Sequence, residues 1–481
     1  MQPSIAERVR AARPLVHCIT NVVTIEWMAR GLLAAGARPV MAMNPDEAAG
    51  VASTADALLL NMGNWGADVQ EAMIAAGRAA NRKGIPVVLD PVGAGGLAGR
   101  TEAVRKLLQQ VRVTAIRGNY GEVAALAGYE GLVRGVDVVS AGPGSGGLNM
   151  AAITAAVATR YRCLVAATGV VDVVSDGACT LEVKSGHPLM DQITGSGCLC
   201  AAVMAAALAA GPQNLDTAAE TLLWLGVAGE EAARMAGGPG SFTGAYLDAL
   251  AAAKELPEGR IAPPLSDRLA CYVIVSGTTP LEVVESVLEA GVKAIQFREK
   301  CLPMGEQVAV ASRMRGLCRE AGALFLVNDR VDLAQAVGAD GVHLGQKDLP
   351  AAVVRRMLGR DVVIGISCGT EEEAQAAERD RADYIGAGPI YPTSSKPDAR
   401  APLAPGALER IVRSVSIPVV GIGGIGVGGA APVIRAGACG VAVISAVVNA
   451  ADPGKAAAQL LAEVEASKKS RSSEGATAHL L

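Results

Sequence analysis

The chain has 481 residues, a formal net charge of −4 and only 3% aromatic residues. Its length exceeds one ordinary core and predicts two or three domains, and it lacks the basic excess typical of a nucleic-acid partner. The longest apolar stretch, residues 198–210, is shorter than the roughly 20 residues that span a bilayer. The N-terminus has no signal pattern, and ten cysteines without a CxxC pair favour a reducing compartment. We therefore expect a cytoplasmic protein without nucleic-acid or membrane partners.

The first half of the chain alternates strand-like and helix-like segments, although unevenly. The predicted strands are Val40–Met43, Ala57–Met62, Val87–Asp90, Thr114–Arg117, Leu164–Thr168 and Asp172–Ser175. Helices between such strands predict an α/β sandwich with a mostly parallel sheet. Neither a GxGxxG after the first strand nor a GxxxxGK[ST] is present, which excludes the usual dinucleotide site and the P-loop.

Two polar clusters of this half follow predicted strands. Leu89–Gly96 carries Asp90 at a strand end, and Arg117–Glu122 places Asn119 and Glu122 three residues apart, on one face of a helical turn. An amide oxygen and carboxylates in such positions suit Mg²⁺ beside ATP phosphates. Each cluster alone is also compatible with an ordinary turn.

A glycine-rich segment, Asp191–Cys198, leads into an alanine-rich helix. Glycines before a helix let backbone N–H groups approach an anion, and the helix N-terminus adds roughly half a positive charge. Such a turn can hold the γ-phosphate during transfer, and the same position would lower the pKa of Cys198 and favour its thiolate. A plain helix start and a small buried cysteine are the alternatives.

Together these residues resemble the ribokinase-like superfamily, and they match its hydroxyethylthiazole kinase branch best. The resemblance covers about residues 1–250 through His17–Asn21, Pro39–Ala42, Leu89–Gly95, Ile116–Glu122, Ala167–Asp172 and Thr194–Cys198. Most ribokinase relatives have an aspartate base where this chain has Cys198, and the thiazole-kinase branch is known for that substitution. The resemblance implies that this catalytic Cys198 takes the hydroxyl proton or only tunes the site.

The same resemblance implies roles for other residues of the first half. The thiazole alcohol would contact Met41 and Gly195, and the cofactor Mg²⁺ would be served by Asp90 and Glu122. ATP, as co-substrate, would contact Arg117, Asn119 and Thr168. Because this kinase family is typically trimeric, the resemblance also implies a homo-oligomer, with a trimer as the expected form.

The chain changes character between about Leu250 and Asp267. Residues 255–264 contain three prolines and no apolar period, and proline stiffens a segment and removes ladder hydrogen bonds. The last residues are rich in lysine, serine and arginine and then small and polar. We predict a kinase-like domain over residues 1–253, a linker over 254–268, a second domain over 269–465 and a disordered tail over 466–481.

The second half alternates regularly. Its predicted strands are Cys271–Val275, Ala294–Arg298, Leu324–Asn328, Gly341–Leu344, Val362–Ile366, Asp383–Ala387, Pro418–Gly421 and Val441–Ser445. Eight βα units in under 200 residues indicate a (β/α)₈ TIM barrel. A doubly wound open sheet is the alternative, but it would not need phosphate chemistry at so many strand ends.

Five of these strands end in polar clusters, and active-site residues of such barrels gather at the C-terminal ends of strands. The clusters are Gln296–Lys300, Asn328–Arg330, His343–Asp348, Pro392–Lys396 and Gly421–Ile425. Asp329 and Asp348 suit Mg²⁺ carrying a diphosphate, while Arg298, Lys300 and Lys396 suit phosphate oxygens. Turns, solvated lysines and a core His343 are the separate alternatives for each cluster.

This ordered set resembles thiamine phosphate synthase over about residues 269–455. The resemblance implies Mg²⁺ on Asp329 and Asp348. For the aminopyrimidine diphosphate it implies Gln296, Phe297, Arg298, Glu299, Lys300, Asn328, Ser367 and Lys396. For the thiazole phosphate it implies Thr393, Ser394, Ser395, Gly424, Ile444 and Ser445. The family usually has threonine where Ser395 stands, and strand alternation points the side chain of Phe297 away from the rim.

The combined interpretation is a bifunctional enzyme of thiamine biosynthesis. Its first domain would phosphorylate 4-methyl-5-(2-hydroxyethyl)thiazole, and its second would join that phosphate to the pyrimidine diphosphate, releasing pyrophosphate through a stabilised pyrimidine methyl cation. One alternative is a kinase of another small alcohol fused to a different phosphate-binding barrel. Another is a non-catalytic sensor of thiamine precursors, which would be expected to lose its metal carboxylates.

Overall fold

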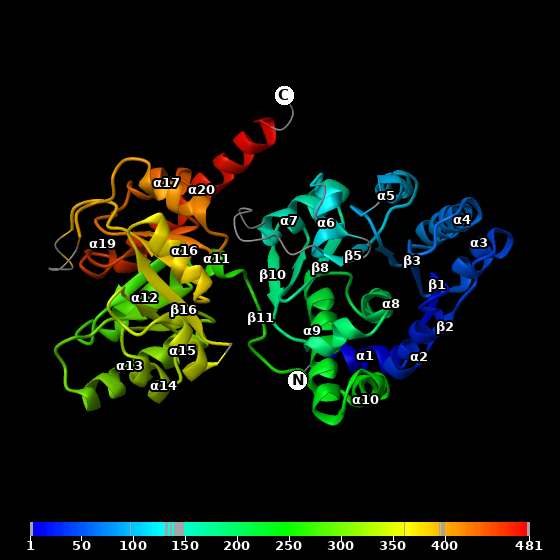
Figure 1. Ribbon diagram of the computed structural model, residues 1–481, viewed down its shortest axis with the longest axis horizontal. Coiled ribbons are helices and arrows are strands. Elements are labelled where there is room, and N and C mark those ends of the chain that lie inside the picture. Colours follow the sequence, from blue (N-terminus) through cyan, green and yellow to red (C-terminus); the bar gives the residue numbers. More distant parts are fainter. Residues whose placement is uncertain are drawn as a thin grey trace. The chain divides into compact units, whose positions relative to one another are not determined.

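The computed structural model describes residues 3–96, 98–129, 133–134, 137–138, 149–359, 361–393, 395 and 400–478. They fall into two compact units, one ending at Pro264 and the other beginning at Leu265. Each unit is described by itself; Figure 1 shows the first mainly in blue to green and the second in green to red.

A nine-stranded sheet forms the centre of the first unit. Its strand order is β11-β10-β9-β8-β5-β4-β3-β1-β2. The six strands from β8 to β2 are parallel to their neighbours, and β9, β10 and β11 are added antiparallel at the other edge. The strands are β1 (Leu15–Ile19), β2 (Arg38–Val40), β3 (Ala57–Asn61), β4 (Val87–Asp90), β5 (Ala115–Asn119), β8 (Leu164–Thr168), β9 (Asp172–Ser175), β10 (Thr180–Val183) and β11 (Ile261–Ala262); β6 (Val133–Arg134) and β7 (Asp137–Val138) form a separate pair.

Helices cover both faces of this sheet, because successive strand side chains point to opposite faces. Leu59 packs on one side and Leu58 on the other. One face carries α1 (Ile5–Ala12), α2 (Ile25–Ala35), α8 (Ser196–Ala210), α9 (Leu215–Met235) and α10 (Pro239–Ala252). The other carries α3 (Pro45–Thr54), α4 (Ala67–Lys83), α5 (Ala98–Gln110), α6 (Tyr120–Ala127) and α7 (Met150–Tyr161), and a 3₁₀ turn, Pro188–Gln192, precedes α8. This arrangement confirms the predicted α/β sandwich with a mostly parallel sheet.

Five strands of the first unit, β1, β6, β7, β10 and β11, lie where no strand was predicted. β1 contains a histidine within a short apolar run, yet His17 is buried and its Nε2 lies 2.7 Å from the carbonyl oxygen of Ala42. β11 lies inside the predicted linker and pairs with β10, with Ala262 opposite Glu182. The prolines of this segment leave Ile261–Ala262 free to pair at the sheet edge, so these two residues belong to the sheet of the first unit.

The second unit is a closed barrel of eight parallel strands in sequence order, as predicted, and Figure 1 shows helices around it. The strands are β12 (Cys271–Val275), β13 (Ala294–Phe297), β14 (Leu324–Asn328), β15 (Gly341–Leu344), β16 (Val363–Cys368), β17 (Tyr384–Ala387), β18 (Val419–Ile422) and β19 (Gly440–Val443). The helices are α11 (Leu265–Arg268), α12 (Leu281–Glu289), α13 (Met304–Glu320), α14 (Val331–Val337), α15 (Ala351–Leu358), α16 (Glu371–Arg379), α17 (Ala407–Ser414), α18 (Ala430–Arg435), α19 (Ser445–Val448) and α20 (Pro453–Ala478).

The barrel has two apolar layers. Outward side chains such as Ile295 and Phe325 pack against the helices, whereas inward ones such as Leu326 and Tyr384 fill the barrel. Because all eight strands are parallel, their carboxyl ends lie on one rim of the barrel, where loops carry the polar residues.

Helix α20 extends to Ala478, through residues for which the sequence predicts a disordered tail. Its continuation is supported by Lys468, whose Nζ lies 3.2 Å from the Asp267 carboxylate, and by Ser467, which donates to the carbonyl of Glu463. No proline of this stretch ends the helix, and the disorder of residues 466–481 stays a prediction.

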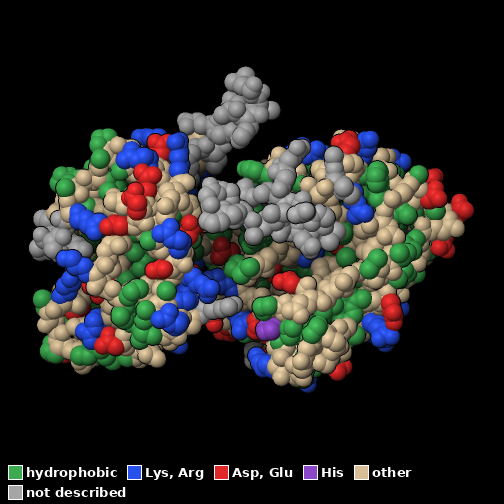
Figure 2. Space-filling view, in the orientation of Figure 1, with side chains coloured by type: hydrophobic (Ala, Val, Ile, Leu, Met, Phe, Trp, Pro, Cys, Tyr) green, Lys and Arg blue, Asp and Glu red, His purple; other side chains and the backbone are tan. Residues whose placement is uncertain are grey.

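None of the helices in the described ranges combines the length and apolar character needed to cross a membrane. All ten cysteines are free thiols. Figure 2 shows acidic and basic side chains intermixed on the visible face of the second unit.

Candidate functional site

Polar side chains from adjacent strand ends form a buried chain in the first unit. Asn61 ends β3 and pairs in register with Asp90 at the end of β4. Its Nδ2 donates to Asp90 Oδ2 at 2.8 Å, and its Oδ1 accepts from Asn21 Nδ2 at 3.0 Å. Asn21 also approaches Cys198 Sγ at 3.6 Å. The loop after β1, two strand ends and the start of α8 thus meet at one place.

Glu122 closes this site from α6. With Asn119 it forms a capping box: Asn119 Oδ1 accepts from the Glu122 N–H at 2.9 Å, and Glu122 Oε2 accepts from the Asn119 N–H at 2.8 Å. Glu122 Oε1 accepts from the N–H of Gly93 at 2.8 Å. The predicted pair of Asn119 and Glu122 is brought together, and it joins α6 to the loop after Asp90.

Asp90 has one oxygen without a partner among the described residues. The residue is 1% exposed, and its Oδ1 makes no hydrogen bond there. Burial is the main cause that raises the pKa of Asp90, and Glu122 adds to the rise while Arg117 opposes it. A buried, unpaired carboxylate oxygen beside a second carboxylate has the chemistry of a hard-cation ligand, so these residues fit the Mg²⁺ that the resemblance implies.

The start of α8 lies against these carboxylates and leaves no room for larger residues. Gly195, the residue before the helix, has a φ of 90°, and a Cβ there would lie 2.5 Å from Thr24 Cγ2. A Cβ on Gly197 would lie 2.4 Å from Arg117 Nη1. The glycines therefore bring the backbone of the helix start close to the Arg117 guanidinium, an arrangement that can receive an anion.

Cys198 is a thiol at neutral pH in this structure. Burial is the largest cause that raises its pKa to about 11, and the nearby Asp90 raises it further, outweighing Asn61, Thr24 and Arg117. The sequence prediction of a lowered pKa and a thiolate is therefore wrong for the free site. Burial and a neighbouring carboxylate disfavour the anion more than the helix start favours it.

The remaining predicted residues of the first unit lie around this site. Arg117 donates from Nη2 to the hydroxyl of Thr168, and Asn119 is in register with Thr168 on the neighbouring strand. Met41 follows β2 and borders the same apolar core as Cys198. Asn21 and Asn61 were not predicted, although the position of Asn61 at the end of a buried strand was a usable signal.

In the second unit, a hydrogen-bonded chain crosses the inside of the barrel. Gln296 donates to the hydroxyl of Tyr272, which lies 2.9 Å from the hydroxyl of Tyr384. His343 Nδ1 lies 2.8 Å from the Tyr384 hydroxyl, and its Nε2 lies 2.9 Å from Ser367 Oγ. Two predicted residues, Gln296 and Ser367, are thus held by three residues that were not assigned to the site. The sequence signal was a polar side chain at an inward position of an otherwise apolar strand.

Asp329 and Asp348 face each other at the rim. Burial is the first cause that raises the pKa of Asp329 to about 6, followed by a hydrogen bond and repulsion from Asp348, while Lys300 and Arg298 oppose the rise. Asp329 has a φ of 60°, a region in which aspartate is among the more frequent non-glycine residues. Facing carboxylates with two cations beside them suit a divalent metal that carries a diphosphate.

The loops after β17, β18 and β19 contact one another at the same rim. A Cβ on Gly424, which has a φ of 68°, would lie 2.6 Å from the carbonyl oxygen of Pro392. Ser395 donates to the hydroxyl of Ser445 at 3.5 Å and its N–H reaches Thr393 Oγ1 at 3.3 Å. The predicted thiazole-phosphate residues are therefore neighbours, with Ile444 immediately before α19.

Four further residues were predicted to bind the substrates of the barrel. Ser394 and Lys396 lie outside the described residues. Phe297 packs outward, its ring 6.4 Å from that of Phe325, so its side chain lies on the opposite face of β13 from Gln296, and its place in the diphosphate set stays a prediction that involves its backbone. Asn328 ends β14 and lies opposite His343 in the register.

The side chain of Glu299 is bound to the backbone of its own loop and of the loop after β12. Its carboxylate accepts N–H groups of Gly277 at 2.8 Å and of Lys300 at 2.8 Å, together with those of Cys301 and Leu302. Partial burial raises its pKa, but these donors outweigh burial and lower it. The carboxylate of Glu299 thus holds the loop in shape, and the place of this residue in the diphosphate set stays a prediction.

Each half of the chain matches a known protein family. The hydroxyethylthiazole kinase family model matches residues 6–255, and the thiamine monophosphate synthase model matches residues 271–447. A thiamine biosynthesis bifunctional protein ThiM/ThiE of Symbiobacterium thermophilum is 59% identical over 97% of this chain and 98% of its own length. A hydroxyethylthiazole kinase of Rubrobacter xylanophilus is 47% identical over 52% of this chain and 91% of the relative. A thiamine-phosphate synthase of Moorella thermoacetica is 51% identical over 39% of this chain and 92% of the relative. The chain therefore belongs to the hydroxyethylthiazole kinase family through its first half and to the thiamine monophosphate synthase family through its second.

Proposed function

We infer that the chain is a bifunctional enzyme of thiamine biosynthesis. Its first half phosphorylates 4-methyl-5-(2-hydroxyethyl)thiazole with ATP, and its second half condenses the thiazole phosphate with 4-amino-2-methyl-5-(diphosphooxymethyl)pyrimidine to thiamine phosphate and pyrophosphate. The observation that carries this conclusion is the 59% identity to a bifunctional relative along 97% of the chain, across both units.

In the kinase step, the start of α8 and Arg117 are proposed to receive the transferring phosphoryl group. Its charge is spread over three oxygens, so backbone N–H groups and a guanidinium that are already in place stabilise it without reorganisation. Asp90 and Glu122 would hold Mg²⁺, which neutralises phosphate charge when bound. Cys198 is placed to orient the thiazole hydroxyl as a neutral thiol, while Met41 and Gly195 would contact the thiazole.

In the coupling step, Arg298, Lys300 and Lys396 are proposed to bind the departing pyrophosphate. Asp329 and Asp348 would hold Mg²⁺, which supplies charge neutralisation for the leaving group. Gln296, Asn328 and Ser367 would hold the pyrimidine part. The thiazole nitrogen then captures the pyrimidine methyl cation, with its phosphate held by the loops of Thr393–Ser395, Gly424 and Ile444–Ser445. Charge stabilisation carries this step, and no covalent enzyme intermediate is required.

One assay tests the whole assignment. Purified protein supplied with the thiazole alcohol, ATP, Mg²⁺ and the pyrimidine diphosphate should form thiamine phosphate, measured by chromatography after oxidation to a fluorescent thiochrome. Omitting ATP should abolish product, and adding preformed thiazole phosphate should restore it. Absence of product in the complete mixture would contradict the bifunctional assignment.

The proposal also includes the domain boundaries, the oligomeric state and the compartment. The functional division is proposed to follow a kinase domain over residues 1–253, a linker over 254–268 and a synthase domain from 269. A homotrimer built through the kinase domain is the proposed oligomer, and the cytoplasm is the proposed compartment. Light scattering of the full chain, with about three times the monomer mass of 48.6 kDa as the expected result, tests the oligomer.

A further inference from the structure

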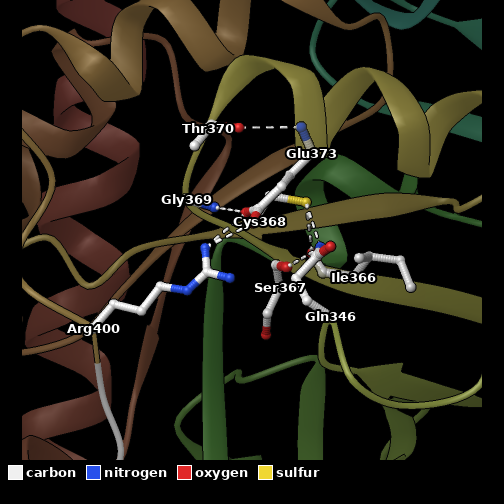
Figure 3. A network of polar contacts seen from close by, with 8 residues as sticks. All are labelled: Gln346, Ile366, Ser367, Cys368, Gly369, Thr370, Glu373 and Arg400. Atoms are coloured by element: carbon white, nitrogen blue, oxygen red, sulfur yellow. Dashed lines mark hydrogen bonds and ion pairs between the residues drawn. The ribbon is translucent and has the colours of Figure 1, made fainter.

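An ion pair joins the segment before α17 to the first turn of α16. Arg400 Nη1 lies 2.8 Å from Glu373 Oε1 and 3.0 Å from Oε2. Figure 3 shows the guanidinium reaching from the segment that precedes α17 toward the start of α16. One nitrogen shared between both carboxylate oxygens fixes the position of the side chain more closely than a single contact would.

Glu373 is at the same time bound to the turn that follows β16. Its Oε2 accepts the N–H of Gly369 at 2.7 Å, and its own N–H donates to Thr370 Oγ1 at 3.2 Å. A Cβ on Gly369 would lie 3.0 Å from Arg400 Nη1, so glycine leaves the space in which the guanidinium lies. The pair is therefore built into this turn and is not a chance contact between two surface side chains.

Ser367 lies at the end of β16, directly before this turn, and the backbone of this strand end is held from the other side. Gln346 Nε2 donates to the carbonyl oxygen of Ser367 at 2.8 Å and approaches Cys368 Sγ at 3.7 Å, as Figure 3 shows. Gln346 lies between Gly345 and Asp348, whose backbone N–H and carboxylate are joined at 2.6 Å. The turn is thus fixed between the loop of a proposed metal ligand and Arg400.

Arg400 follows Ser395 by five residues in the chain. Thr393 and Ser395 lie on the thiazole-phosphate side, beside Ser445, whereas Ser367 lies on the pyrimidine side. The segment of Arg400 is held against the start of the loop after β17, because Leu403 donates its N–H to the carbonyl oxygen of Pro389 at 2.8 Å, and Arg400 joins this segment to Glu373 beside the turn after β16.

We propose that Arg400 and Glu373 are positioning residues that set the distance between the two substrate subsites of the synthase. This proposal rests on the proposed function of the barrel. Neither side chain touches the reacting atoms; the pair holds the loop of Thr393 and Ser395 relative to the strand end of Ser367. Small misplacements of two reactants strongly slow the reaction between them. Loss of the ion pair should therefore lower kcat more than it changes either KM.

The test compares Arg400→Ala, Arg400→Lys and Glu373→Gln in the full chain. The Arg400→Ala variant should lower kcat for coupling about tenfold, with each KM changed less than about threefold. Arg400→Lys, which keeps one point contact, should recover part of the rate. The kinase activity of the same molecules should remain unchanged and reports that the chain is intact.

Arg410→Ala is the matched control. Arg410 Nε contacts Glu371 Oε1 at 2.8 Å and joins α17 to α16, and its side chain is 55% exposed against 57% for Arg400. It does not touch the turn after β16, so kcat should stay within twofold of wild type. Equal coupling rates in the Arg400→Ala and wild-type enzymes, or a loss shared by Arg410→Ala, would overturn the proposal; an inactive wild type would instead reject the proposed function.

Discussion

At the scale of single residues, the environment decides what each polar side chain contributes. Asn61 and Asp90 end neighbouring strands. Asn61 donates to one carboxylate oxygen of Asp90, and the other oxygen has no hydrogen-bond partner among the described residues. Glu299 and Asp348 also illustrate the difference: Glu299 is occupied by four backbone N–H groups, whereas Asp348 faces Asp329. The backbone N–H groups that a carboxylate accepts do not decide its role alone: Glu122 and Asp348 also accept backbone N–H groups, but each lies beside a second carboxylate.

Replacing Cys198 by alanine should slow the kinase step about tenfold or more without affecting coupling. The thiol lies beside Asn21, and its pKa of about 11 keeps it protonated. Its contribution is therefore orientation of the hydroxyl, and the kinase rate should show no thiol titration between pH 6 and 9. Steady-state rates of both steps across this range check the prediction. If the pH–rate profile of the kinase step has a limb that disappears in Cys198→Ala, the thiolate takes part in the step and the prediction is wrong.

Lowering the pH should weaken Mg²⁺ binding by the barrel. The pKa of Asp329 is raised to about 6, so its carboxylate gains a proton in the folded chain before it would in the unfolded one. Protonation of Asp329 relieves the repulsion from Asp348. The contribution of Asp329 to the stability of the metal-free fold therefore increases as the pH falls from about 6 toward 4. Metal affinity falls over the same window, by about tenfold per unit below pH 6.

Calorimetric Mg²⁺ titration at pH 8 and pH 5 measures this effect. Asp90→Asn is the suitable background, because it removes a proposed kinase ligand and leaves the signal of the barrel. An Mg²⁺ affinity of the barrel that does not change between the two pH values would contradict the assignment of Asp329.

At the scale of elements, the start of α8 makes the kinase site. The helix is apolar on all sides and is buried from Leu199 to Leu208, so its position is fixed by the core and not by the ligand. Its first turn meets Arg117 from β5 and Asn21 from the loop after β1. Packing thus holds the anion site in place before any substrate arrives.

Replacing Gly195 by alanine should damage this helix start. The residue has a φ of 90°, and a Cβ would lie 2.5 Å from Thr24, so the backbone has to shift. The strain should cost about 1–2 kcal/mol of stability and reduce kinase activity at least tenfold. Thermal unfolding and kinase rates measure the two effects. Gly240→Ala, where no atom lies within 4 Å, is the control; equal behaviour of the two variants would refute the steric argument.

At the scale of the whole molecule, each unit has its own core and its own carboxylates. The apolar clusters of the sandwich and of the barrel do not share residues. The two chemical steps are therefore expected to be separable by mutation within one chain.

Asp329→Ala should abolish coupling by removing a metal ligand and leave thiazole phosphorylation at the wild-type rate. Asp90→Asn should do the reverse, and coupling should persist when preformed thiazole phosphate is supplied. Separate assays of the two steps on both variants check this. Loss of both activities from either single change would contradict independent sites.

The sequence alone predicted both architectures and most of the residues gathered in the two sites. Regular βα alternation with polar strand ends specifies a barrel with a functional rim, because parallel strands end on one side. The glycines before α8 and the pair of Asn119 and Glu122 are local patterns, and their contacts followed from sequence spacing. Residues whose role depends on a neighbour close in sequence were thus predictable.

Only the tertiary structure decided the features that depend on burial and on distant partners. It showed that Cys198 is a thiol, because burial and Asp90 raise its pKa, and that Glu299 is occupied by the backbone of two loops. It also joined Arg400 to Glu373, 27 positions apart. Strand order, burial and long-range contacts set these interactions, and no local spacing encodes them: the sequence determined which groups stand at the strand ends, and packing decided which of them remain free to act.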